Sequence, residues 1–140
     1  MSGKLQNFNS DGIIFQIMDH ARVAVFEDDT VIRHLVSAML EGSNHTVVAE
    51  ASTVDDALAV IDLARSGELE IDAVLLDGNL NADTVTCEDA RRIAQTIKDF
   101  GLATKIIGLS AYELSRFGIP VDCDLTKGRI NSLNQTLDSL

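Results

Sequence analysis

From residue 22 onward, short runs of apolar residues alternate with longer segments in which apolar residues recur every three or four positions. The short runs are continuously apolar, which is typical of strands that are buried on both faces of a sheet. The longer segments have the period of amphipathic helices. A chain that alternates such strands and helices is predicted to form an open parallel sheet with helices on both faces.

Five strands can be placed from this pattern, over residues 22–26, 45–51, 71–76, 105–109 and 121–125. Helical stripes follow the first three strands, and Thr53 is positioned to cap the second of these helices. A narrower stripe near the end of the chain consists of Ile130, Leu133, Leu137 and Leu140. Only about ten residues, 111–120, connect the fourth and fifth strands. Because a complete crossover usually needs about a dozen residues or more, the fourth helix is expected to be shortened or missing.

The length of 140 residues fits one domain, which we assign to residues 21–140, with residues 1–20 as an N-terminal extension. The net charge of −11 disfavours direct binding of nucleic acid. Cys87 and Cys123 fall in no disulfide or zinc pattern. No apolar run approaches the ~18 residues of a membrane span. We therefore expect a cytoplasmic protein without membrane association.

Polar side chains follow the predicted strands at the points where the strands end. They are Glu27, Asp28 and Asp29 after the first strand, Asp77 after the third, Ser110 after the fourth, and Lys127 after the fifth. Open parallel sheets bind ligands in the crevice beyond the carboxyl ends of their strands. These side chains are therefore predicted to share one crevice.

Several carboxylates in one crevice repel one another unless a cation lies among them. Oxygen ligands suit Mg²⁺, or Mn²⁺ in its place. With such a cation bound, one carboxylate can attack a phosphoryl phosphorus, while a lysine and a hydroxyl bind phosphoryl oxygens. The acidic pair, Asp77, Ser110 and Lys127 are together sufficient for reversible aspartyl phosphorylation.

This arrangement resembles the receiver domain of bacterial response regulators over about residues 22–140. The pattern from Val25 to Arg33 resembles the family's opening strand and helix, and the arginine aligns Glu27 and Asp28 with the paired metal positions, leaving Asp29 outside them. Val74-Leu75-Leu76-Asp77 resembles the strand that ends in the phosphoacceptor. Leu109-Ser110-Ala111 resembles the switch hydroxyl with its small neighbour, and Lys127 resembles the family's lysine.

The resemblance implies a CheY-like, doubly wound sheet of five parallel strands in the order 2-1-3-4-5. It implies that Asp77 accepts a phosphoryl group with the help of Lys127 and Ser110. The implied Mg²⁺ ligands are Glu27, Asp28, Asp77 and the backbone carbonyl of Asn79. By the same resemblance, Asn79 and Tyr112 tune the lifetime of the phosphoryl group.

The chain departs from the family pattern at several positions. Gly78-Asn79-Leu80-Asn81 and Gly128 stand where the family usually has a proline. Asp124 replaces the aromatic residue expected three positions before the lysine. In the family this aromatic side chain follows the switch hydroxyl inward on phosphorylation, which Asp124 cannot do. The sequence therefore supports phosphorylation of Asp77 better than it supports the family's aromatic switch, by which phosphorylation changes the surface of the domain.

Three functions remain open from the sequence. The first is a stand-alone response regulator, phosphorylated by a histidine kinase or a histidine phosphotransfer protein, that signals to an unidentified protein target and is not a turnover enzyme. The second is a receiver-like binding module that works without phosphorylation, as Asp124 and the short fourth helix suggest. The third is a Mg²⁺-dependent phosphohydrolase. Such enzymes typically have a second Asp where this chain has Asn79, which argues against the third.

Overall fold

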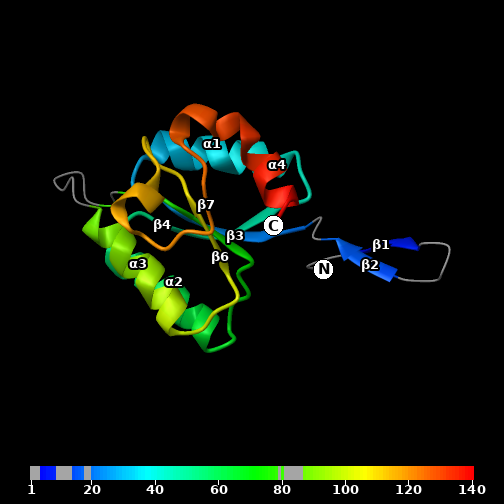
Figure 1. The fold of residues 1–140 in the computed structure, drawn as a ribbon, viewed down its shortest axis with the longest axis horizontal. Helices are drawn as coiled ribbons and strands as arrows, with labels where there is room; N and C mark the ends of the chain where they lie inside the picture. The colour runs from blue at the N-terminus through cyan, green and yellow to red at the C-terminus, as the bar shows by residue number, and fades with distance from the viewer. Residues whose placement is uncertain (1–3, 9–13, 18–19, 79, 81–86) are drawn as a thin grey trace.

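A computed structural model describes the chain over residues 4–8, 14–17, 20–78, 80 and 87–140, with side chains described from residue 20 onward. The main sheet has five parallel strands in the spatial order β4-β3-β5-β6-β7 (Figure 1). These strands are β3 (Arg22–Phe26), β4 (Thr46–Ala51), β5 (Ala73–Leu76), β6 (Lys105–Gly108) and β7 (Cys123–Asp124). Counted along the chain within this sheet, the order is 2-1-3-4-5. The predicted fold class is confirmed.

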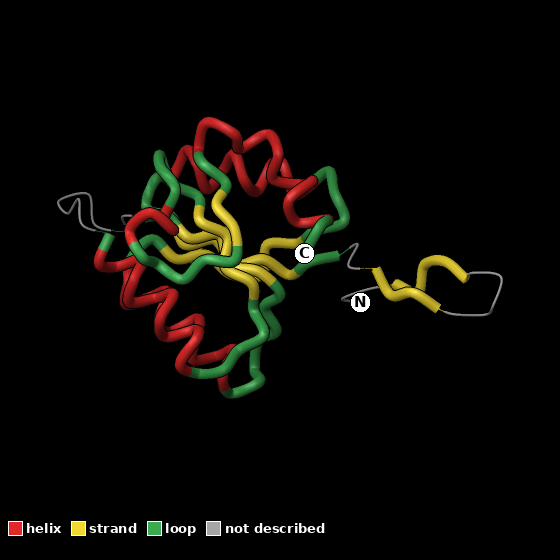
Figure 2. The backbone as a smooth tube through the Cα atoms, viewed as in Figure 1, coloured by secondary structure: helices red, strands yellow, loops and turns green. Residues whose placement is uncertain are grey.

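Helices cover both faces of the sheet. Helices α1 (Thr30–Glu41) and α4 (Leu133–Asp138) lie on one face, and α2 (Val54–Arg65) and α3 (Glu88–Asp99) on the other (Figures 1 and 2). Successive residues of β3 serve the two layers in turn: Val23 and Val25 pack with α1 and α4, whereas Ala24 and Phe26 pack with α2 and α3. Burial on both faces thus explains why the strands are continuously apolar.

Helices α1 and α2 each begin at a residue whose side chain caps the helix. Asp29 Oδ1 accepts a hydrogen bond from the backbone N–H of Val31 (2.8 Å), and Thr53 Oγ1 accepts one from Asp56 (3.2 Å). The predicted cap at Thr53 is confirmed. Because the Asp29 carboxylate is occupied at the start of α1, it stabilises that helix end.

The connection between β6 and β7 contains only the 3₁₀ helix η1 (Leu114–Phe117), which ends at Gly118 with a φ of +73°. The prediction of a shortened helix here is confirmed. Strand β7 is shorter than predicted, because at the sheet edge it pairs only with Ile107 and Gly108. The last helix also starts later than its apolar stripe, since the 3₁₀ segment η2 (Lys127–Ser132), broken at Arg129, precedes it.

Strands β1 (Lys4–Phe8) and β2 (Ile14–Ile17) pair antiparallel in a separate two-stranded sheet. They contribute no strand to the five-stranded sheet, whose strands were all predicted after residue 20. The division into an extension and a domain stays a prediction. Within the described residues, no helix has the length and apolar character needed to cross a bilayer.

Candidate functional site

Backbone hydrogen bonds at the ends of the strands bring the predicted site residues to one edge of the sheet. The N–H of Asp77 donates to the carbonyl of Phe26 (2.9 Å), so Asp77 leaves the sheet beside Glu27. On the next strand, the N–H of Leu109 donates to the carbonyl of Leu76 (2.8 Å). The register of the parallel strands therefore determines which side chains can meet.

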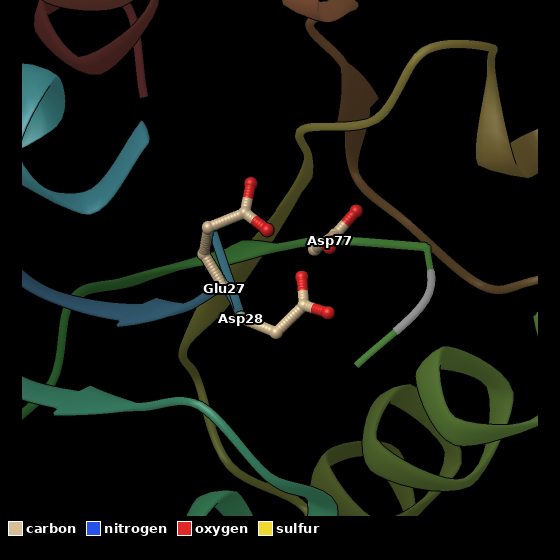
Figure 3. Close-up of side chains that lie close together, drawn as sticks. All are labelled: Glu27, Asp28 and Asp77. Atoms are coloured by element: carbon tan, nitrogen blue, oxygen red, sulfur yellow. The ribbon is translucent and has the colours of Figure 1, made fainter. Parts of the chain in front are cut away.

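Glu27, Asp28 and Asp77 form a cluster of carboxylates. Each offers one oxygen, and the three oxygens lie within 4.8 Å of one another. Figure 3 shows the three side chains facing a common space. Glu27 is 1% exposed and Asp77 5%, whereas Asp28 is half-buried. The acidic pair predicted from the sequence thus meets Asp77, and Asp29 stays outside the cluster.

Lys127 reaches this cluster from beyond β7. Its backbone N–H donates to the carbonyl of Ser110 (2.7 Å), which ties the two strand ends together. Its Nζ lies 2.9 Å from Glu27 Oε1 and 3.5 Å from Asp77 Oδ1. One ammonium group therefore faces two buried carboxylates.

The close approach of the carboxylates and the lysine changes the pKa values of Asp77 and Lys127. Burial and the neighbouring Glu27 carboxylate raise the pKa of Asp77 to about 8, against the opposing effect of Lys127. Burial lowers the pKa of Lys127, but contacts with Glu27 and Asp77 raise it by more. The site therefore holds one carboxyl that favours its proton unless another cation enters.

The residues present fit a divalent cation. Oε1 of Glu27 is fully buried and, among the described residues, is met by the Lys127 ammonium at 2.9 Å. Because Glu27 shares this one ammonium with Asp77, the negative charge of the three carboxylates is only partly offset. Three converging carboxylates supply the hard oxygen ligands that Mg²⁺ takes. Asn79 lies outside the described residues, so its predicted carbonyl ligand and its tuning role stay predictions.

The space behind Asp77 is closely packed. A Cβ on Gly78 would lie 2.8 Å from Ser110 Oγ, 2.9 Å from Leu114 Cδ2 and 3.4 Å from Cys87 Sγ. Cβ atoms essentially never lie this close to other atoms, so a larger residue after Asp77 would require Ser110 or Leu114 to shift. Ser110 is itself buried, with its hydroxyl oxygen against Gly78. The predicted switch hydroxyl thus lies beside the residue that follows Asp77.

No protein-family model matches the chain, and no curated protein matches it either. Solved structures do. The receiver domain of the response regulator NarL from Mycobacterium tuberculosis is 21% identical, with a TM-score of 0.67 over 87% of this chain and 99% of that one. A DNA-binding response regulator of the LuxR family from Staphylococcus aureus is 19% identical, with a TM-score of 0.69 over 85% and 97%. The chain has the receiver-domain fold.

A mutant of the receiver domain of the histidine kinase CKI1 from Arabidopsis thaliana is similar as well. It is 20% identical, with a TM-score of 0.63 over 82% of this chain and 85% of that chain. At such identities the similarity establishes the fold alone. What the receiver fold does in this chain has to be argued from its own side chains.

Tyr112 lies two residues before η1 and is partly exposed to solvent. Its side chain is 39% exposed, its ring centroid lies 5.1 Å from that of Phe117, and its hydroxyl lies 3.8 Å from Cys87 Sγ. Cys87 is fully buried. The tuning role of Tyr112 stays a prediction.

Two contacts of this receiver fold were missed by the reasoning from sequence. Arg33 Nη1 donates to the backbone carbonyl of Glu27 (2.8 Å) and so supports the acidic pair from α1. In the sequence, Arg33 served only as a landmark of the family pattern. Asp124 accepts hydrogen bonds from η1, a role that its place in the chain did not indicate.

Proposed function

We propose that this protein is a two-component response regulator that accepts a phosphoryl group on Asp77 and signals through contact with another protein. The observation that carries the proposal is the convergence of Glu27, Asp28 and Asp77 within 4.8 Å, with Lys127 Nζ 3.5 Å from Asp77. The receiver fold, which gives these strand ends a common edge, supports it. The donor in this proposal is a phosphohistidine of a histidine kinase or phosphotransfer protein.

In the proposed reaction an oxygen of the ionised Asp77 attacks the phosphorus of the phosphohistidine. A P–O bond forms, the P–N bond breaks with its electron pair passing to the imidazole nitrogen, and the leaving imidazole takes up a proton from solvent. The Lys127 ammonium, already beside Asp77, binds an oxygen of the incoming phosphoryl group. The Ser110 hydroxyl, at the neighbouring strand end, can donate a hydrogen bond to a second phosphoryl oxygen. Hydrolysis of the acyl phosphate later returns Asp77.

Glu27 and Asp28, together with Asp77, would hold a Mg²⁺ ion. When bound, Mg²⁺ neutralises charge on the phosphoryl oxygens and keeps Asp77 ionised. The single Lys127 ammonium, shared by the buried carboxylates of Glu27 and Asp77, leaves part of the negative charge of the cluster to be offset and so supports this assignment. A cytoplasmic location belongs to the same proposal, because it depends on the proposed kinase partner.

The test is phosphorylation by acetyl phosphate in the presence of Mg²⁺, followed by intact-mass measurement. We expect a gain of one phosphoryl group that hydroxylamine removes and that Asp77→Asn abolishes. Asp28→Asn is expected to weaken Mg²⁺ binding. The matched Asp29→Asn variant is expected to bind Mg²⁺ like the wild type, because Asp29 caps α1 and asparagine is an equally good cap. An unmodified wild-type protein after hours of incubation would contradict the proposal.

One observation favours a second candidate, a receiver-like binding module that signals without phosphorylation. The Asp124 carboxylate is engaged with η1, so the aromatic switch of the family pattern has no counterpart at this position. The second candidate predicts that wild type forms no adduct and binds its target as tightly as Asp77→Asn does. The first predicts that phosphorylation changes target binding and that Asp77→Asn removes the change.

A further inference from the structure

The 3₁₀ helix η1 has no cap of its own. Glu113, at its N-cap, makes no side-chain hydrogen bond to the helix. The Asp124 carboxylate supplies the missing acceptors from β7: Oδ1 accepts from the backbone N–H of Leu114 (2.7 Å), and Oδ2 accepts from Ser115 Oγ (2.6 Å) and, at 3.3 Å, from the Ser115 N–H. Hydrogen bonds to an ionised acceptor are among the stronger ones in proteins. The carboxylate therefore clamps η1 to the edge strand.

The clamp determines where Leu114 packs. Leu114 is fully buried, and its two methyl groups lie over two glycines. A Cβ on Gly108 would lie 3.2 Å from Leu114 Cδ1 and 2.7 Å from Asp124 Oδ1, whereas a Cβ on Gly78 would lie 2.9 Å from Leu114 Cδ2. Leu114 thus joins the end of β6 to the backbone that follows Asp77.

Ser110 completes this contact path. Its Oγ lies against the same face of Gly78 as Leu114 does, and its carbonyl accepts the backbone N–H of Lys127. A shift of Leu114 would therefore displace Gly78, which follows Asp77, and the Ser110 hydroxyl beside it. A closely packed interior transmits such displacements.

We propose that Asp124 is a positioning residue of the phosphoacceptor site: by clamping η1 it holds Leu114 against Gly78, and so fixes the backbone after Asp77 together with the hydroxyl of Ser110. The inference rests on the proposed function, since it assigns a role in that reaction. Asp124 does not contact Asp77 and acts through Leu114. The residue that departs most from the receiver pattern thus becomes part of how this site is assembled.

A purely structural role would stabilise the β6–β7 connection and leave the site unchanged. The experiment therefore measures the site directly, in Asp124→Ala, Asp124→Asn and the control Asp122→Ala. Asp122 is a suitable control because its carboxylate also accepts a backbone N–H, from Ile106 (2.7 Å), and its other oxygen faces Lys98 and not η1. The readouts are amide chemical shifts of Gly78 and Ser110 in the metal-free protein, Mg²⁺ affinity, and the rate of phosphorylation by acetyl phosphate.

Asp124→Ala is expected to shift the Gly78 and Ser110 amide signals and to slow phosphorylation roughly tenfold, since small displacements of reacting groups are costly. Its Mg²⁺ affinity is expected to change less than its phosphorylation rate, because two of the proposed ligands, Glu27 and Asp28, follow β3 and not β5. Asp124→Asn keeps an acceptor for the Leu114 N–H but loses the one for Ser115, so its rate is expected to lie between those of Asp124→Ala and the wild type. Asp122→Ala is expected to leave both amide signals and the rate unchanged.

Unshifted Gly78 and Ser110 signals in a folded Asp124→Ala would overturn the inference, and so would shifted signals with a wild-type phosphorylation rate. If Asp124→Ala does not fold, the intermediate effects expected of Asp124→Asn decide by the same criteria. Absence of any adduct on the wild-type protein would instead contradict the proposed function. In that case the amide signals still show whether Asp124 positions the backbone beyond Asp77.

Discussion

The ammonium group of Lys127 lies 2.9 Å from Oε1 of Glu27, an oxygen that is shielded from solvent. In the metal-free protein this lysine is thus the cation that offsets the buried charge of Glu27. A divalent cation at the same carboxylates would share that charge with Lys127 and be repelled by it. The lysine is therefore expected to weaken Mg²⁺ binding even while it assists phosphoryl transfer.

Replacing Lys127 with glutamine is expected to tighten Mg²⁺ binding by roughly an order of magnitude, because the positive charge beside Glu27 and Asp77 is removed. The same variant is expected to be phosphorylated more slowly. Isothermal titration calorimetry measures the affinity, and Lys105→Gln, at an exposed lysine at the start of β6, is the control. Weaker Mg²⁺ binding by Lys127→Gln would show that the lysine does not compete with the metal.

The stability of the metal-free protein is expected to depend on Asp77 and on pH. The pKa of this carboxyl rises from an ordinary 3.8 to about 8 on folding, so between these values the folded state binds more protons than the unfolded state. The contribution of Asp77 to the free energy of unfolding therefore falls as pH rises from about 4 to about 8.

Asp77→Asn cannot ionise and escapes this loss. In EDTA at pH 8 we expect it to be more stable than the wild type by on the order of 2 kcal/mol after allowance for solvent screening, with the difference vanishing near pH 4. Urea unfolding at the two pH values measures it. Saturating Mg²⁺ is expected to remove or reverse the advantage. A higher free energy of unfolding for the wild type than for Asp77→Asn, at pH 8 without metal, would contradict the raised pKa of Asp77.

The strand ends could be predicted because a parallel sheet aligns them: once the apolar runs were placed, Glu27, Asp77, Ser110 and Lys127 had to lie at one edge. The capping of α1 by Asp29 agrees with its place outside the acidic pair. Such features follow from local pattern together with one topological rule.

The role of Asp124 could not be predicted in this way. It depends on the approach of a β7 carboxylate to two backbone N–H groups ten and nine residues earlier in the chain. The sequence indicated only that an aromatic residue was missing. The close packing around Gly78 is likewise hidden, because it arises from Ser110 and Leu114, which lie far along the chain.

Gly78→Ala is expected to be destabilising by about 1–3 kcal/mol, since its Cβ would meet Ser110 Oγ at 2.8 Å and Leu114 Cδ2 at 2.9 Å. It is also expected to slow phosphorylation by displacing Ser110. Urea unfolding measures the first effect and intact-mass kinetics the second. Gly42→Ala is the control, because a Cβ there meets nothing within 4 Å and its φ is −85°. Equal stability of the two variants would show that Ser110 and Leu114 can move aside at little cost.

His45 connects the start of β3 to the C-terminal helix. Its Nδ1 accepts a hydrogen bond from the backbone N–H of Ala21 (2.9 Å), so the other ring nitrogen, Nε2, carries the hydrogen and donates to Asp138 (2.7 Å). The imidazole is 1% exposed. This pairing gives a structural reason for a histidine that the sequence left without a role.

His45→Ala is expected to lower the free energy of unfolding by about 2–3 kcal/mol, because the Ala21 N–H loses its partner in a buried position and a cavity is left behind. Asp138→Asn is expected to cost less, since the carboxylate is exposed and an amide oxygen can still accept from Nε2. His34→Ala, on the exposed side of α1, is the control and is expected to change stability by less than about 0.5 kcal/mol. Urea unfolding at pH 7 compares the three. A His45→Ala protein as stable as His34→Ala would mean that Ala21 finds another acceptor, and that the imidazole does not anchor the first strand to α4.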